Sequence, residues 1–469
     1  MWDFCQFGSA TAIIDEQGLQ ISYDTLIVEN QKIVEQIGKR CLVFSLCRNE
    51  IGAIIGYSAF INAGIVPVLL NARMERELLD NLISTYKPSY IWVPQDQVNE
   101  FPKLEMLYSA WSYALMKTNF AVEYELYPEL CLMLTTSGST GSPKFVRQSY
   151  ENVKANAESI VEYLELNASE RPITTLPMNY TYGLSIINSH FMVGATILVT
   201  DKGLMQKEFW NFFKEQKATS FGGVPYTYEM LERLRFFRMD LPNLRCMTQA
   251  GGKITPELHK KFAEYAADNG KKFVVMYGQC EATARMGYLP PHKAVEKCGS
   301  MGIAIPGGTF HLIDVDGKII DEPYMTGELV YEGRNVTLGY AECGEELIKG
   351  DERGGVLHTG DMAQFDEEGY YYIVGRKKRF LKIYGNRVNL DEIDRLIKSK
   401  FENLDAASTG VDDHMYIFVT DESKADAVKN FVVAKTKLNP VAFETIVIDE
   451  IPKNDAGKTL YKELERYYE

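Results

Sequence analysis

Excess positive charge, clustered cysteines and long apolar runs are all missing from this sequence. Its 50 Lys and Arg residues face 64 Asp and Glu residues, and the net charge of −14 argues against nucleic acid or an anionic membrane as the main partner. The eight cysteines form no C-x-x-C pair and the six histidines are scattered, so no zinc site is indicated. No apolar run is long enough to span a membrane, and the start lacks the basic and apolar regions of a signal peptide. We therefore expect a soluble, cytoplasmic protein with reduced thiols and no nucleic-acid partner.

What the sequence does contain is an alternation of apolar strands and amphipathic helices. With 469 residues, 46% of them hydrophobic, the chain has material for about two to four domains. Near the N-terminus we expect strands at 41–46, 65–70 and 90–93, and helices at 50–64 and 75–86. This β-α-β-α-β order predicts an α/β protein built on parallel strands with right-handed crossovers.

The alternation continues and then changes character. Further helices are expected at 152–164 and 207–215, and strands at 130–134, 172–176, 196–199 and 272–276. Beyond about residue 300, short segments between glycines, such as 327–333 and 369–375, favour antiparallel pairing. The last stretch, about 390–469, is predicted to be α+β, with helices at 391–401 and 424–436 and a strand at 415–419. A basic run at 376–387 precedes it, and we place a domain boundary at Lys377–Lys378.

The most informative segment is Thr136-Ser-Gly-Ser-Thr-Gly-Ser-Pro-Lys144, which follows the apolar run 130–134 directly. Glycines let the backbone approach a ligand, hydroxyls add hydrogen-bond donors, and a lysine adds a full charge, so the loop suits phosphate. A turn-rich surface loop is the other interpretation. The segment does not match the Walker pattern G-x-x-x-x-G-K-[ST], and Pro452 replaces the first glycine that Gly457-Lys458-Thr459 would need. An ordinary P-loop kinase or GTPase is therefore disfavoured.

Four other short segments combine glycines with residues that can bind a nucleotide. Tyr277-Gly-Gln-Cys-Glu281 follows an expected strand, where an aromatic ring could stack on a base and a carboxylate could hold Mg²⁺. Gln249-Ala-Gly-Gly252 would allow close approach of a flat ring, and Leu357-His-Thr-Gly-Asp361 offers a carboxylate for a ribose diol. Ile451 to Lys458 places a lysine on a turn near the C-terminus. Taken singly, each of these segments also reads as a solvated turn.

Taken together and in order, these motifs resemble the acyl-adenylate-forming superfamily. The resemblance rests on 136–144, 277–281, 359–361, Gly375-Arg376 with Gly385-Asn-Arg387, and 452–458, and it covers nearly the whole chain. The superfamily contains acyl- and aryl-CoA synthetases, nonribosomal-peptide adenylation domains and firefly luciferase. It implies ATP and Mg²⁺, a carboxylic-acid substrate, and a thiol acceptor that is either CoA or an acyl or peptidyl carrier protein.

The resemblance also implies a role for individual residues of these motifs. Lys458 would be the adenylation lysine and Glu281 would hold Mg²⁺, with Lys144 as a third catalytic residue. The remaining nucleotide-binding residues implied are Thr136, Ser137, Gly138, Ser139, Thr140, Gly141, Gly251, Gly252, Tyr277, Gly278, Cys280, Asp361 and Arg376. The physical logic agrees, because a carboxylate that attacks ATP is an anion approaching an anion, and cations must lower that barrier.

The implied architecture has two parts joined by a hinge. A large N-terminal domain, residues 1–376, would hold parallel and mixed sheets flanked by helices, with a β-rich section at about 300–376. A hinge at residues 377–378, centred on Lys378, would lead to a small mobile α+β domain, residues 379–469, that carries Lys458. In this arrangement Lys382, Gly385 and Arg387 would line the approach of the thiol acceptor.

Departures from the family pattern bear on the substrate. Cys280 replaces the usual threonine, and a thiol is a weaker donor than a hydroxyl, so we expect slower adenylation. Residues 176–190 contain no Asp or Glu to pair with an ammonium group, which favours an acyl or aryl acid over an amino acid. The acid pocket is expected to include Tyr180, Tyr182, Gly183, Gly278 and Met286. A freestanding amino-acid adenylating enzyme that loads a carrier protein and a non-catalytic nucleotide-binding relative remain as alternatives.

Overall fold

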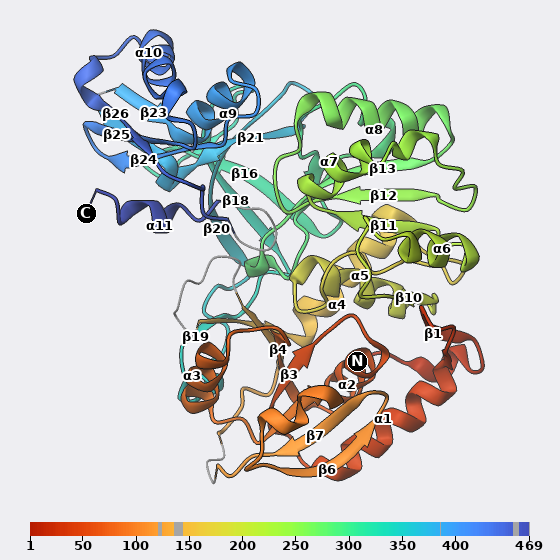
Figure 1. Ribbon diagram of the computed structural model, residues 1–469. Helices are drawn as coiled ribbons and strands as arrows, with labels where there is room; N and C mark the ends of the chain where they lie inside the picture. The colour runs from red at the N-terminus through yellow and green to blue at the C-terminus, as the bar shows by residue number, and fades with distance from the viewer. Residues whose placement is uncertain (121–123, 136–143, 385, 454–458, 469) are drawn as a thin grey trace. The chain divides into compact units, whose positions relative to one another are not determined.

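The chain is an α/β protein that folds into two compact units (Figure 1). A computed structural model describes residues 1–120, 124–135, 144–384, 386–453 and 459–468. The first unit comprises Met1–Thr309 with Tyr331–Leu357, and the second comprises Phe310–Val330 with His358–Glu469. In the described part of the chain, no helix is both long and apolar enough to cross a membrane.

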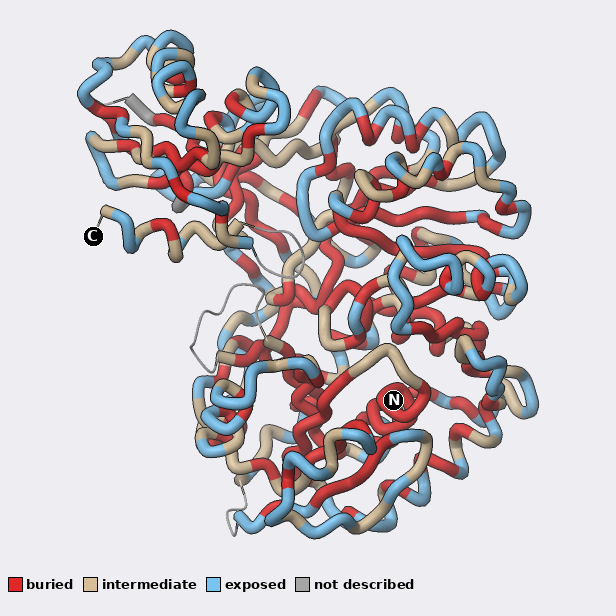
Figure 2. The backbone as a smooth tube through the Cα atoms, in the orientation of Figure 1, coloured by how far each residue is buried: buried red, intermediate tan, exposed pale blue. Residues whose placement is uncertain are grey.

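An eight-stranded mixed sheet forms much of the first unit. Its order is β19-β9-β8-β4-β3-β5-β7-β6, with parallel pairing among β4, β3 and β5 and between β4 and β8, and antiparallel pairing elsewhere. The central strands β3, β4 and β8 are mostly apolar and almost wholly buried, as Figure 2 shows, because helices pack against the sheet. The strands are β3 (Leu42–Cys47), β4 (Val66–Asn71), β5 (Tyr90–Pro94), β6 (Glu105–Ala110), β7 (Tyr113–Lys117), β8 (Leu130–Thr135), β9 (Phe145–Ser149) and β19 (Gly339–Ala341).

Two helices of this part start at a side chain that caps them. Ser149 and Asn152 form a capping box at the start of α4 (Tyr150–Leu164), and Ser22 caps α1 (Tyr23–Ile37). The other two helices are α2 (Ile51–Asn62), which is almost wholly buried, and α3 (Arg76–Tyr86). A small sheet of β1 (Thr11–Asp15), β2 (Gln20–Ser22) and β10 (Ile197–Val199) completes the N-terminal region.

A five-stranded sheet in the order β11-β12-β13-β14-β15 forms the rest of the first unit. Its first three strands are parallel, so their carboxyl ends share one edge, and α8 lies beside β13 (Figure 1). Tyr228 of α7 packs on Phe262 of α8 and on Phe273 of β13, which fixes these helices on the sheet. The strands are β11 (Ser220–Gly223), β12 (Cys246–Gln249), β13 (Lys272–Tyr277), β14 (Gly287–Tyr288) and β15 (Ile303–Ala304), and the helices are α5 (Thr181–Met192), α6 (Lys207–Glu215), α7 (Pro225–Arg233) and α8 (Pro256–Asp268).

The second unit contains a β-rich sheet and a smaller α+β body. The sheet runs β17-β16-β18-β20-β21. The body holds the hairpin β22-β23 and the sheet β24-β25-β26, and its described residues also form helices α9, α10 and α11. The elements are β16 (Gly308–Ile313), β17 (Ile319–Ile320), β18 (Gly327–Gly333), β20 (Val356–Phe365), β21 (Tyr371–Arg376), β22 (Phe380–Ile383), β23 (Asn386–Asn389), α9 (Leu390–Lys400), β24 (Ala406–Val411), β25 (His414–Val419), α10 (Ala425–Thr436), β26 (Phe443–Val447) and α11 (Tyr461–Glu465).

One expected strand is wrong. Residues 172–176 do not form a strand, because Pro172 and Ile173 make only isolated bridges, to Ser220 and Leu198 respectively. Pro172 and Ile173 each bridge a different neighbour, so no continuous ladder with one partner strand forms. The predicted α/β class, with a small α+β region at the C-terminal end, is confirmed. The proposed boundary at Lys377–Lys378 falls in a short 3-10 turn, Lys377–Arg379, between β21 and β22.

Candidate active site

The phosphate-loop motif lies between two paired strands. Thr135, the last residue of β8, pairs with Phe145, the first residue of β9, so the described residues on either side of the motif are neighbours in the sheet. Lys144 stands directly before β9 and is about one third exposed. The other loop residues predicted to bind nucleotide, Thr136, Ser137, Gly138, Ser139, Thr140 and Gly141, lie outside the described residues, as do Gly385 and Lys458.

Tyr340 of β19 joins Lys144 to Glu281. The Lys144 Nζ atom lies 3.7 Å from the centroid of the Tyr340 ring, and the Tyr340 hydroxyl donates a 2.8 Å hydrogen bond to Glu281 Oε1. Burial, together with the neighbouring carboxylate, raises the pKa of Tyr340 to about 12, so the phenol keeps its proton and remains a donor. A cation and a carboxylate from distant parts of the sequence are thereby held on one aromatic side chain.

Arg353 fixes the backbone on which Glu281 sits. Its Nη1 atom donates to the Glu281 carbonyl oxygen at 3.0 Å and to Thr337 Oγ1 at 3.2 Å, while its guanidinium carbon lies 4.8 Å from the Tyr340 ring centroid. The Thr337 N–H donates to the same carbonyl at 3.0 Å. These contacts hold the residue in place and leave its side chain partly exposed for a ligand.

The turn after β13 is tight and strained. A Cβ atom on Gly278 would come within 1.5 Å of the Ala284 carbonyl oxygen, so only glycine fits there. Two residues that are not glycine follow in positive-φ conformations, Thr283 at 62° and Ala284 at 153°. Backbone strain of this kind persists where the surroundings over-determine it and is common at ligand sites. Cys280, in the same turn, is buried.

The Gln249–Gly252 turn meets Tyr180 at the end of β12. Gly251 has φ +83°, and a Cβ atom there would lie 2.7 Å from the Tyr180 hydroxyl oxygen. Gly252 is exposed, and a Cβ atom on it would meet only Pro225. The half-buried Tyr277 side chain ends β13 at the same edge of the sheet, because β12 and β13 are parallel neighbours. The structure thus brings together the two glycines, Tyr180 and Tyr277 at the carboxyl edge where such sheets bind ligands.

The residues expected to line the acid pocket are more deeply placed. Tyr182 is fully buried, and its hydroxyl is 2.8 Å from the Thr248 carbonyl oxygen. Met286 is also fully buried, and Gly183 packs so closely that a Cβ atom would lie 2.3 Å from the Pro177 carbonyl oxygen. The guanidinium carbon of Arg285 lies 3.9 Å from the centroid of the Tyr182 ring.

The second unit holds its own group of expected site residues. Asp361 in β20 is buried, and its Oδ1 atom lies 3.2 Å from Arg376 Nε in the neighbouring strand β21. Lys382 is exposed and pairs in the β22–β23 hairpin with the backbone of Arg387. Lys378 lies in the turn before that hairpin. The carboxylate and the guanidinium predicted to contact the ribose are therefore adjacent.

Sequence reasoning missed three residues of the first unit, namely Tyr340, Arg353 and Arg285. The first two belong to no motif, and their contact with Glu281 depends on the pairing of β19 with β9. Arg285 follows Glu281 by only one turn of chain, and an arginine in an otherwise apolar segment was the available signal.

Comparisons with known proteins found one matching family and many similar sequences and structures. The model of the family described as AMP-binding enzyme matches residues 33–341. A 2-succinylbenzoate–CoA ligase of Bacillus cereus (strain AH820) is 27% identical over 438 residues, covering 90% of this chain and 88% of the ligase. Among solved structures, an O-succinylbenzoate coenzyme A synthetase (MenE) from Bacillus subtilis in complex with AMP has a TM-score of 0.78 at 20% identity, covering 99% of this chain and 98% of that one. ATP-bound MatB from Rhodopseudomonas palustris gives the same TM-score, identity and coverage. At this identity the structural likeness shows the fold.

Proposed function

The chain belongs to the AMP-binding enzyme family, and we propose that it is an acid–CoA ligase that forms AMP. In the first half-reaction an oxygen of the acid's carboxylate bonds to the α-phosphorus of ATP, and the bond from that phosphorus to the bridging oxygen of pyrophosphate breaks. In the second, the thiol sulfur of CoA bonds to the acyl carbon, AMP leaves, and the thiol proton is released. Curated relatives named as CoA ligases support this assignment.

The observation that carries the proposal is the cluster in which Tyr340 joins Lys144 and Glu281. Phosphoryl chemistry between two anions needs positive charge held ready beside the triphosphate. Lys144 supplies a cation at the end of the phosphate-loop motif, and the hydrogen bond from Tyr340 keeps one carboxylate oxygen of Glu281 in a fixed place. A simple solvated surface turn would not place Lys144 and Glu281 in contact with the same half-buried tyrosine, Tyr340.

Glu281 fits the role of a Mg²⁺ ligand. Among the described residues no group of three or more His, Cys, Asp and Glu gathers around one point, so an all-protein metal cage is not indicated there. Mg²⁺ bound with ATP typically takes one or two carboxylates and completes its shell with phosphate and water oxygens, and a single oriented glutamate suffices for that. When bound, Mg²⁺ would neutralise part of the charge on the phosphates.

The second unit would supply the rest of the nucleotide contacts. We propose that Asp361 accepts hydrogen bonds from the ribose hydroxyls and that Arg376, which already lies beside it, reaches the ribose and phosphate. Lys458 is proposed to bridge the acid's carboxylate and the α-phosphate. A hinge at Lys378 would let the domain that begins at residue 379 withdraw this lysine and present Lys382, Gly385 and Arg387 to the thiol acceptor.

The test combines an acid panel with one lysine variant. Acids of several classes, including 2-succinylbenzoate and amino acids, are incubated with enzyme, ATP, Mg²⁺ and hydroxylamine, and hydroxamate is measured. We expect acyl or aryl acids to react and Lys458→Ala to lower the rate by about 10²–10³-fold while ATP still binds by calorimetry. The exposed Lys462, four residues away, serves as the matched control, and Lys462→Ala should keep the wild-type rate.

Other results would change the assignment in defined ways. Hydroxamate only with amino acids would make the chain an amino-acid adenylating enzyme. Thioester formation on a phosphopantetheinylated carrier protein, with none on CoA, would change the acceptor. No hydroxamate with any acid, together with ATP binding, would indicate a non-catalytic relative, and a wild-type rate in Lys458→Ala would remove that lysine from the mechanism.

A further inference from the structure

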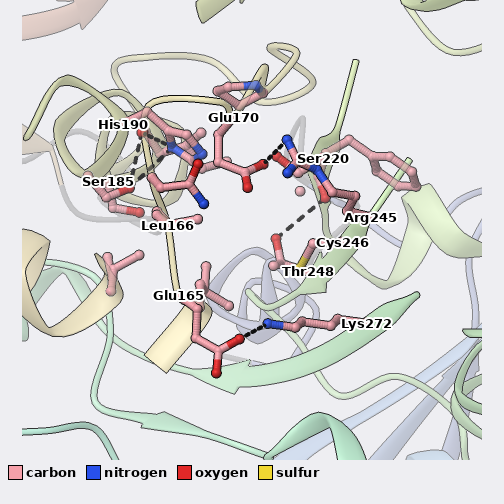
Figure 3. A pocket seen from close by; sticks show the side chains of 18 of the residues that line it. Glu165, Leu166, Glu170, Ser185, His190, Ser220, Arg245, Cys246, Thr248 and Lys272 are labelled. Atoms are coloured by element: carbon pink, nitrogen blue, oxygen red, sulfur yellow. Dashed lines mark hydrogen bonds and ion pairs between the residues drawn. The ribbon is translucent and has the colours of Figure 1, made fainter. Parts of the chain in front are cut away.

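A cavity of about 280 Å³ lies between helices α4 and α5 and the strands β11 and β12 (Figure 3). Alternate residues of a strand face one side of a sheet, and Cys246 and Thr248 of β12 face this cavity, while Ser185, Ser189 and His190 line it from α5. Its volume is near the ~300 Å³ at which small-molecule pockets begin. The cavity is therefore large enough to hold part of a small ligand.

The rim of the cavity is charged but balanced. Glu165 forms an ion pair with Lys272, and Glu170 lies 3.4 Å from Arg245, as the side chains drawn in Figure 3 illustrate. Three of these four side chains are well exposed, at 77%, 37% and 45% for Glu165, Lys272 and Arg245. Each rim cation thus has its own carboxylate, and the rim carries no net charge to attract a ligand.

The interior carries a cation that lacks such a carboxylate. Arg285 lines the cavity and is 3% exposed, and among the described residues no carboxylate oxygen lies within ion-pair distance of it. Its guanidinium stacks on Tyr182 and lies beside the Tyr163 side chain, while its Nε atom is buried without a partner in the described structure. A buried charge without compensation is costly, which is unusual unless a ligand completes the site.

His190 adds an unused acceptor to the same interior. Burial lowers the pKa of His190 to about 4, so the ring is neutral near pH 7. Its Nδ1 atom is 2.8 Å from the Ile186 carbonyl oxygen and must donate to it, because a carbonyl only accepts. Nε2 is then an acceptor, and it is buried without a partner among the described residues. Among the described residues that line the cavity, Arg285 and His190 are the two with a buried side-chain nitrogen that has no partner.

The interior adjoins the residues expected to hold the acid. Arg285 is next to Met286 in the chain, and a Cβ atom on Gly278 would lie 3.1 Å from the Cα atom of Arg285. Tyr182, on which Arg285 stacks, begins the face of α5 that continues through Ser185 and Ser189 to His190, eight residues and roughly 12 Å along the helix. Arg285 therefore adjoins both the residues expected to hold the acid and the cavity.

We propose that this cavity receives the far end of the acid substrate and that Arg285 selects acids with a second carboxylate there. The inference rests on the proposed adenylating function and specifies its substrate class as dicarboxylic acids. A second carboxylate would pair with the Arg285 guanidinium in a charge-assisted, bidentate contact, the geometry for which arginine is best suited. Arg285 is in this sense a specificity residue, because it would contact the substrate away from the reacting atoms.

The test uses acids that differ only in the second carboxylate. Adipate is compared with hexanoate, and glutarate with pentanoate, in ATP- and Mg²⁺-dependent pyrophosphate release by wild type, Arg285→Met and Arg285→Lys. We expect wild-type kcat/KM to favour the diacid, Arg285→Met to lower that ratio by about 30-fold or more, and Arg285→Lys to restore part of it. The change should appear mainly in KM for the diacid, with the monoacid little affected. Arg233→Met, which removes an exposed charge from α7, should leave the ratio as in wild type.

Each outcome decides one claim. If wild type releases pyrophosphate and the diacid-to-monoacid ratio is the same in Arg285→Met, the selection by Arg285 is wrong and the adenylating function stands. If no acid releases pyrophosphate, the proposed function fails, and calorimetric titration of adipate into the ATP-bound enzyme tests the site alone. Adipate binding that is lost in Arg285→Met would then support the site, and equal binding would overturn it. Circular dichroism shows whether Arg285→Met folds. If it does not, the diacid-to-monoacid ratio of Arg285→Lys is compared with that of wild type instead.

Discussion

Two buried arginines in the first unit have opposite surroundings. Arg147, in β9, is fully buried. Its guanidinium donates to the carbonyl oxygens of Tyr340 at 2.9 Å, Gly350 at 3.2 Å and Leu338 at 3.3 Å, and also to that of Lys349, with the Glu352 carboxylate at 2.5 Å. Arg285 is buried to nearly the same degree, but its guanidinium stacks on the Tyr182 ring and lies beside Tyr163, and its Nε atom has no partner among the described residues. The hydrogen bonds of Arg147 are satisfied by the protein alone, and those of Arg285 are not. We take this difference to distinguish a structural arginine from one that binds a ligand.

Two buried histidines repeat the contrast. In His259 the Nε2 atom is 2.9 Å from the Ala294 carbonyl oxygen, and Nδ1 accepts from the Gly299 N–H at 3.3 Å, so the neutral ring is fully used. In His190 only Nδ1 is used. Burial lowers the pKa of both rings to about 4, so charge does not distinguish them. The two rings differ instead in whether both nitrogens have a hydrogen-bond partner, and the ring with an unpartnered nitrogen is the one that lines the cavity.

The largest expected effect comes from Arg147→Met. The change would leave four carbonyl oxygens and a carboxylate without their donor at a buried site, and we expect a loss of about 3–5 kcal/mol in the free energy of unfolding. Urea unfolding followed by tryptophan fluorescence measures it, since all four tryptophans belong to the first unit. A loss below about 1 kcal/mol would mean that complete hydrogen bonding does not mark a structural arginine here.

Arg285→Met should behave differently in the same experiment. Replacing a buried, uncompensated cation by an apolar side chain of similar length is often neutral or stabilising, so we expect a change within about 1 kcal/mol of zero. The two variants remove the same group from similar depths, and each is the other's control. A loss as large as that of Arg147→Met would make Arg285 a structural residue and would end the contrast.

The histidines give a pH-dependent version of the test. The pKa of His190 is about 4 in the folded chain and ordinarily 6.5, so between these values the unfolded chain binds more protons and stability falls as pH drops. His190→Gln removes the pH dependence that His190 contributes. The unfolding free energy of the variant should therefore fall less than that of wild type between about pH 6.5 and about pH 4.5. His259→Gln should also be less stable at neutral pH, because two hydrogen bonds are lost. Parallel curves for wild type and His190→Gln would show that His190 is not held neutral.

The smallest effect is expected at the cavity rim. Lys272 and Glu165 form an exposed ion pair, and exposed pairs contribute little because water and salt screen them. Lys272→Met should therefore change the unfolding free energy by less than about 1 kcal/mol, by the same fluorescence assay. A loss of several kcal/mol in the unfolding free energy would mean that this exposed pair stabilises the fold as much as the buried contacts of Arg147 do.

The sequence predicted the fold well because most elements are locally encoded. Helix α6 and strand β18 match the expected ranges, and α2, α4, β3 and β13 differ by a few residues, since capping side chains and apolar runs define their limits. The site was predictable only where a motif carries it. Tyr340 and Arg353 reach Glu281 through strand pairing between distant segments, and the incomplete bonding of Arg285 depends on what packs around it, so no local pattern could reveal either.

The most direct measurement of the proposed chemistry is exchange of labelled pyrophosphate into ATP, because it reports the first half-reaction without any thiol acceptor. Wild-type enzyme with Mg²⁺ and a dicarboxylic acid should incorporate label. Omitting the acid should abolish incorporation, and Lys458→Ala should slow it by about 10²–10³-fold. Incorporation without acid, or none with any acid tested, would contradict the assignment of this chain as an adenylate-forming ligase.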